Sequence, residues 1–128
     1  MYYDARPSAY NGLFDFYTTE PLKGYYPFKM FNELYRKKNA CKCTFDEGNG
    51  LYAAAATGES GKAVMISYFV DDDNCKEPYD VQLDLIGSDE TYDVILLDKE
   101  HDAEVVKQVK NGETLTLLPN TVCLLKTL

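Results

Sequence analysis

The stretch AVMISYFVDDDNCKEPYDVQLDL, residues 63–85, decides the fold class. In its second half every other residue from Tyr79 to Leu85 is apolar and the residues between are polar. This period of two predicts a strand with one buried and one solvated face. In residues 63–70 both alternating sets are largely apolar, which predicts a central strand covered on both sides. The acidic run 71–74 between them predicts a turn.

Other segments repeat this pattern along the chain. Further strands are predicted at residues 40–46, 51–57, 92–98, 103–109, 114–118 and 121–128. Turn signals rich in Gly, Asn and Asp separate them, and the connections are too short for crossover helices, which argues against a parallel sheet. About eight short strands with a turn every ten or so residues predict an all-β fold, an antiparallel β-sandwich.

The first part of the chain differs in composition. Of the 11 Tyr and 6 Phe residues, most lie before residue 36. Within this aromatic-rich segment one helix is predicted, because Pro27 suits a first helical turn and three cations follow at its end. Phe28, Phe31, Leu34 and Tyr35 recur at helical spacing, and we expect this stripe to pack on the sandwich.

Charge and hydropathy exclude several classes of partner. Thirteen Lys and Arg stand against 21 Asp and Glu, a net charge of -8. A nucleic-acid partner requires clustered cations, so this balance argues against one, and equally against an anionic membrane surface. No apolar run approaches the roughly 20 residues of a spanning helix.

The four cysteines are Cys41, Cys43, Cys75 and Cys123. Cys-x-Cys without a second pair or a nearby histidine is a poor zinc signature. We expect buried free thiols, with a disulfide or a metal site as the alternatives. Free thiols favour a reducing compartment, hence the cytoplasm.

No catalytic constellation is visible, and no cofactor is predicted. His101, the single histidine, falls in a loop without a nucleophile motif. The run 71–74 could offer oxygen ligands to calcium, but it lacks the glycine and distal glutamate of an EF-hand loop, so a solvated turn is preferred. The glutamates form no recognisable acid and nucleophile pair of the kind that glycoside hydrolysis uses.

The first third of the chain nevertheless carries a resemblance. MYYDARP at 1–7, YNGLFDFY at 10–17 and PLKGYYPFKMFNEL at 21–34 resemble the end of a (β/α)8 barrel in clan-A retaining glycoside hydrolases, especially family 39. In that likeness residues 1–5 correspond to the eighth barrel strand and 6–24 to the loop before the last helix.

The resemblance implies a division and a function. Residues 1–38 would be the barrel end, and residues 39–128 a C-terminal β-sandwich. The family's two catalytic glutamates would lie upstream of Met1, so the chain is not expected to be an enzyme by itself. Barrel loops at the carboxyl ends of strands build the active-site face. Near the sugar site of the parent enzyme we therefore expect Tyr3, Asp4, Arg6 and Asn11, although Asp4 and Arg6 could instead pair to fix the loop.

Two functional hypotheses follow. The first is a noncatalytic accessory domain of a glycoside hydrolase that packs against the catalytic barrel and stabilises it. The alternative is an independent carbohydrate-binding module, since aromatic rings stack on sugars. The aromatic segment fits either packing or sugar binding. On the first hypothesis we expect the isolated chain to hide its aromatic surface by self-association, to leave the segment mobile, or to fold it back onto the sandwich.

Overall fold

The computed structural model describes residues 12–127 and contains one α-helix and eight strands. A short 3-10 turn, η1 (Lys23–Tyr25), leads into α1 (Tyr26–Lys37). The strands are β1 (Asn39–Cys41), β2 (Leu51–Gly58), β3 (Gly61–Tyr68), β4 (Tyr79–Gln82), β5 (Tyr92–Leu97), β6 (Asp102–Val109), β7 (Thr114–Leu117) and β8 (Thr121–Thr127). Within this part of the chain no helix is both long and apolar enough to cross a membrane.

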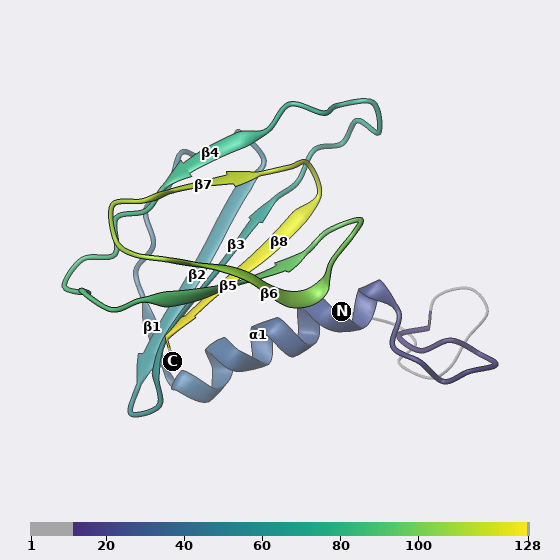
Figure 1. Cartoon of the computed structure of the whole chain (residues 1–128), viewed down its shortest axis with the longest axis horizontal. Helices are drawn as coiled ribbons and strands as arrows, with labels where there is room; N and C mark the ends of the chain where they lie inside the picture. The colour runs from purple at the N-terminus through teal and green to yellow at the C-terminus, as the bar shows by residue number, and fades with distance from the viewer. Residues whose placement is uncertain (1–11, 128) are drawn as a thin grey trace.

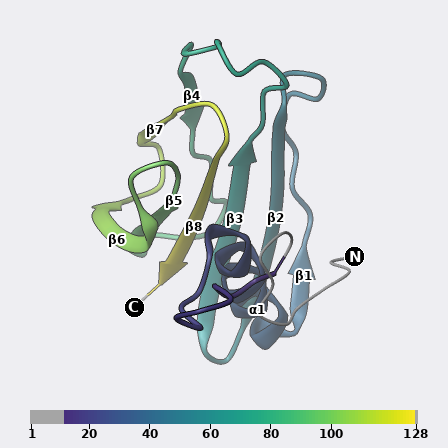
Figure 2. The same cartoon turned by 90° about the vertical axis from the view of Figure 1, so that its right-hand side faces the viewer.

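The strands form two antiparallel sheets. Six of them pair in the order β1-β2-β3-β8-β5-β6, and β4 pairs with β7 in a separate two-stranded sheet. The small sheet covers one face of the large one, and α1 lies on the opposite face (Figure 1). Figure 2 shows α1 nearly end-on against the sheet. The predicted antiparallel sandwich preceded by one helix is confirmed, and β3 is central as expected.

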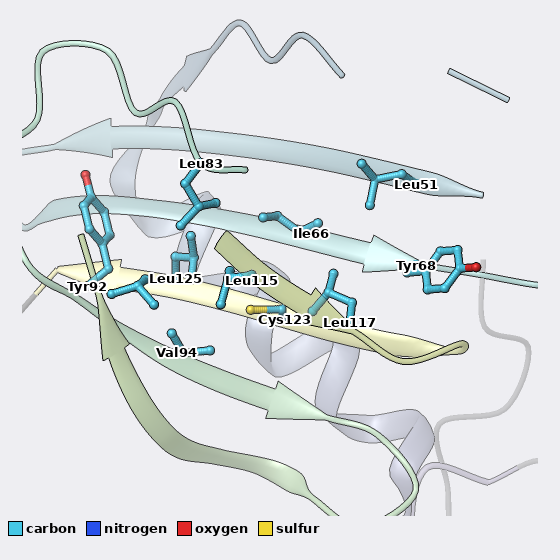
Figure 3. Packing of buried hydrophobic residues seen from close by; sticks show 11 residues of the cluster. Leu51, Ile66, Tyr68, Leu83, Tyr92, Val94, Leu115, Leu117, Cys123 and Leu125 are labelled. Carbon is cyan, nitrogen blue, oxygen red and sulfur yellow. The ribbon is translucent and has the colours of Figure 1, made fainter. Parts of the chain in front are cut away.

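The main core fills the space between the two sheets. From β8, the buried side chains of Cys123 and Leu125 face Leu115 and Leu117 of β7 (Figure 3). Tyr92 of β5 closes one end of this core, and its hydroxyl lies 2.7 Å from the Ser88 hydroxyl, so its polar tip is satisfied although the ring is buried. The core between the two sheets is therefore formed by the alternating apolar residues of the strands, as the sequence pattern indicated.

A second core lies between α1 and the large sheet. Met30 and Leu34 are 2% and 6% exposed, and they pack on the outer face of the strands. The sheet contributes small and branched residues to this contact, which are Ala56, Ala63, Leu97 and Leu124. Consequently the large sheet is buried on both faces, as the doubly apolar sequence of β3 predicted.

The predicted helix is present, but the predicted contact stripe is wrong. Phe28, Phe31 and Tyr35 are exposed, and only Leu34 of the expected stripe reaches the sheet. Leu34 packs together with Met30, one turn earlier, which the prediction had left out. The slender Met and Leu side chains let the helix approach the sheet closely, whereas the larger rings lie on another flank.

The first strand is shorter than predicted. Only Asn39, Ala40 and Cys41 pair with β2, opposite Thr57, Ala56 and Ala55. Beyond Cys41 the chain leaves the edge of the large sheet, and Phe45 packs against the core between the sheets.

Candidate functional site

The residues expected near a sugar site, Tyr3, Asp4, Arg6 and Asn11, lie outside the described residues, as do Tyr2 and Tyr10. The proposed barrel loop is described only from Gly12 onwards. There Asp15 accepts hydrogen bonds from the backbone N–H groups of Tyr17 and Thr18, each at 2.8 Å. These bonds lower the pKa of the Asp15 carboxyl.

The aromatic rings of this loop divide into packed and exposed ones. Phe14 lies 5.3 Å from Tyr25 between ring centroids, and Tyr25 in turn contacts Tyr26 at 5.7 Å. By contrast, Phe16 and Tyr17 are exposed to solvent. The aromatic segment is therefore not fully absorbed into the described part of the molecule.

The start of the helix is fastened to the turn between β5 and β6. The Lys23 ammonium donates to the backbone carbonyls of Asp98 (2.7 Å) and His101 (3.3 Å) and to the Asp102 carboxylate (2.7 Å). Three acceptors around one ammonium use all of its donors. This contact fixes the position of the helix start along the sheet.

The other end of the helix is held as well. Lys37 is buried although it is charged, and its ammonium donates to the carbonyl and hydroxyl of Ser60 in the turn between β2 and β3. On the adjacent flank Glu33 pairs with Lys126 of β8 at 2.8 Å, and this contact lowers the pKa of the Glu33 carboxyl despite its partial burial. Polar contacts at both ends therefore fix which flank of α1 faces the sheet.

The flank of α1 that carries Phe31 and Tyr35 forms one wall of a groove. Phe31 and Tyr35 are 56% and 77% exposed, and they stand beside the outer face of β1 and β2. Between helix and strands lies a hollow of about 630 Å³. It is lined by Phe31, Leu34, Tyr35, Arg36, Lys38, Ala40, Ala54, Ala55 and Ala56. We refer to this hollow as the helix groove.

A separate aromatic pair lies further along the same face of the sheet. Tyr52 is paired opposite Ser67, so Phe69, two residues beyond Ser67, is its diagonal neighbour. Tyr52 and Phe69 are 59% and 54% exposed. The sequence analysis had not brought these two residues together, because the pairing register of β2 and β3 cannot be read from composition.

A second hollow, of about 440 Å³, opens between the two sheets on the side of β1 and β2. The two-stranded sheet is too narrow to cover the whole inner face of the large one. Small inward-facing residues, Ala53 and Ala55, form part of its floor. At its margin Lys62 and Glu90 pair at 2.6 Å.

His101 lies in a loop, as predicted, and has a defined partner. Asp98 accepts from the N–H groups of Glu100 and His101 and contacts the His101 imidazole at 2.9 Å. Burial alone would raise the pKa of Asp98, but these hydrogen bonds outweigh it and the pKa is lowered. The contacts give Asp98 and His101 a structural role in shaping the turn that Lys23 binds.

The remaining candidate residues, in the acidic run 71–74 and at the cysteines, do not come together as a cluster of three or more metal-ligating side chains in the described part of the chain. Asp72 accepts from the N–H of Asn74 within the acidic run, an exposed turn. Among residues 12–127, no three His, Cys, Asp or Glu side chains are placed to hold a metal ion. All four cysteines are free, as expected, yet only Cys123 is buried, and Cys41 is exposed because β1 is an edge strand. The prediction of buried thiols is therefore confirmed for Cys123 and wrong for Cys41, whereas Cys43 and Cys75 are half-buried.

Comparison with known proteins identifies a shared fold. Neither a protein-family model nor a curated protein matches the sequence. Among solved structures, a GH30 endoxylanase from Clostridium papyrosolvens C71 matches with a TM-score of 0.73 and 16% identity. The match covers 91% of this chain and 30% of the endoxylanase chain. The fold is thus similar to part of this GH30 enzyme, and the expected likeness to family 39 is not confirmed.

Proposed function

We propose that the chain is a noncatalytic C-terminal accessory β-domain of a glycoside hydrolase, which packs against the catalytic barrel and stabilises it. The observation that carries this proposal is the fold shared with the endoxylanase, which extends over 91% of the chain but only 30% of that enzyme. A chain that spans less than a third of such an enzyme matches an accessory part better than a complete one.

Two features of the molecule support this assignment. We assign residues 1–38 to the end of the barrel and residues 39–128 to the sandwich. The helix and the exposed side chains of Phe16 and Tyr17 belong to the first of these parts. Contacts of Lys23 and Lys37 hold the helix to the sheet at both ends. The sandwich would therefore brace the last helix of the barrel.

The reading frame upstream of Met1 tests the proposal. We expect it to continue through a sequence that codes for a (β/α)8 barrel with two catalytic glutamates, in roughly 250 residues or more. The 128-residue chain alone should not hydrolyse aryl-glycosides of xylose, arabinose or glucose. Turnover by the purified chain, abolished by substitution of one of its own carboxylates, would refute the noncatalytic assignment.

A second candidate function is carbohydrate binding by the sandwich itself. The exposed, diagonally placed Tyr52 and Phe69 favour it, since aromatic faces can stack on sugar rings. Calorimetry with xylo-oligosaccharides tests this function. A micromolar dissociation constant, about -8 kcal/mol, that is lost in Tyr52→Ala would favour the binding module. On the accessory-domain proposal we expect no such binding.

A further inference from the structure

Two thiols lie on the same face of the chain where the edge strand β1 ends. Cys41 is paired opposite Ala55, which lines the second hollow, so the Cys41 side chain lies on the inner face of the large sheet. Side chains two residues apart on an extended chain share a face, and Cys43 lines the same hollow. Both thiols are free, and neither is fully buried. They therefore form an accessible pair on the wall of the hollow between the sheets.

The spacing of the pair is wide for a disulfide. An extended chain rises about 3.3 Å per residue, which places Cα atoms two positions apart at about 6.6 Å. This value is near the upper end of the roughly 4.4–6.8 Å found in disulfides, and side chains that point the same way do not approach each other without backbone movement. An ion between the sulfurs spans a wider gap, because two metal–sulfur bonds of about 2.3 Å replace one sulfur–sulfur bond of about 2.05 Å.

The number of ligands restricts which ion the pair can hold. Among residues 12–127 no third His, Cys, Asp or Glu side chain is placed to complete a metal site with the two cysteines. Zinc in a structural site takes four protein ligands, so zinc is disfavoured. Soft thiolate ligands favour copper(I), which is stable with two sulfur ligands in a line. A two-sulfur pair therefore suits copper(I) better than zinc.

Charge and protonation are compatible with such an ion. Burial and the neighbouring Cys41 raise the pKa of the Cys43 thiol, so Cys43 carries its proton at neutral pH until an ion displaces it. That Cys41 acts on Cys43 also indicates that their sulfurs lie close together. Two thiolates around one monovalent ion leave a negative charge, and the Lys42 side chain between them in sequence lines the same hollow. A nearby cation stabilises thiolates.

We propose that Cys41 and Cys43 bind one copper(I) ion as a two-coordinate bis-thiolate site on the wall of the second hollow. The ion replaces the two thiol protons, which pass to solvent, and copper stays monovalent because no electron is transferred. The site does not rest on the proposed function, since it uses only the position of two side chains at the edge of the large sheet.

Competition with a coloured chelator tests the proposal. The reduced chain is titrated without oxygen into the copper(I) complex of bicinchoninate, and it should withdraw one ion per chain. Cys41→Ser and Cys43→Ser should each weaken copper(I) binding at least tenfold, because one thiolate alone does not complete the site. Cys75→Ser removes a half-buried thiol that does not line the hollow, so this matched control should bind as the unchanged chain does.

The possible outcomes separate this site from other modes of binding. Undiminished binding by either single variant would overturn the proposal, as would no withdrawal of copper by the unchanged chain. One ion shared by two chains, seen as a dimer in sedimentation, would overturn the site within one chain. Alkylation provides a readout that needs no variant: bound copper(I) should protect Cys41 from iodoacetamide, and unprotected labelling at saturating copper would contradict the proposal. Circular dichroism of each variant should match that of the unchanged chain, because none of the three substituted thiols is fully buried.

Discussion

The sharpest prediction compares two neighbouring residues of α1, Leu34 and Tyr35. Leu34 is 6% exposed and packs between helix and sheet with Met30, so Leu34→Ala removes buried atoms and leaves a cavity. Such changes cost about 2–5 kcal/mol of unfolding free energy. Tyr35 is 77% exposed, so Tyr35→Ala removes little buried surface from the isolated chain and should cost about 0.5 kcal/mol or less.

Thermal denaturation followed by circular dichroism measures both variants on the same scale. At roughly 4 °C for each kcal/mol in a domain of this size, Leu34→Ala should lower the melting temperature by about 8–20 °C, and Tyr35→Ala by no more than about 2 °C. Met30→Ala should behave like Leu34→Ala, because both lie in the same contact. A Tyr35→Ala variant as destabilised as Leu34→Ala would refute the assigned orientation of the helix.

Three further predictions follow from single residues. Gly61→Ala should destabilise the chain by more than about 1 kcal/mol, because Gly61 has φ +99° and a new Cβ would crowd the Thr127 hydroxyl. Folding lowers the pKa of Asp98, so the ionised carboxylate stabilises the chain above about pH 4, and this contribution disappears as the pH falls further. The Asp98→Asn variant lacks the contribution at every pH, so its unfolding free energy should fall less between neutral and acid pH than that of the unchanged chain. Burial raises the pKa of Cys123 to about 12, so at pH 8 a disulfide reagent should modify the exposed Cys41 readily and Cys123 only after unfolding.

Matched variants isolate each cause. Gly87→Ala also sits at positive φ, +73°, but in open space, so it should cost less than Gly61→Ala in the same melt. Asp84→Asn removes one negative charge at an exposed carboxylate away from this turn and is the matched charge control. Rapid labelling of Cys123 in the native chain would contradict its burial in the core.

The strands were predictable because each one has a simple local period. Val64, Ile66 and Tyr68 face one core and Ala63 and Met65 the other, which the doubly apolar sequence of β3 had indicated. The assignment of strands to sheets was not predictable in the same way. β8 pairs with both β3 and β5, contacts that join segments far apart in the chain, and no local pattern specifies them.

The predicted orientation of the helix was wrong for a physical reason that the sequence partly conceals. The residues of α1 satisfy two apolar periods at once: Met30 with Leu34, and Phe31 with Tyr35. Propensity and hydrophobicity do not distinguish the pairs, and the larger rings would have suggested the second. In the observed orientation Met30 and Leu34 face the sheet, and polar contacts accompany it: Lys37 reaches Ser60 and Glu33 reaches Lys126.

A helix with two apolar faces contains more apolar surface than one contact can bury. In a surface helix of a globular domain, polar residues occupy the flank opposite the core. Here the polar flank of α1 is narrow, because Phe31 and Tyr35 are exposed beside its buried face. Alanine residues of β1 and β2 lie next to these two rings. Selection for solubility of this chain alone would favour polar residues there, since a contiguous exposed apolar patch promotes association. This surplus apolar flank is what the proposed function expects of α1, since residues 1–38 would then pack against the rest of a barrel.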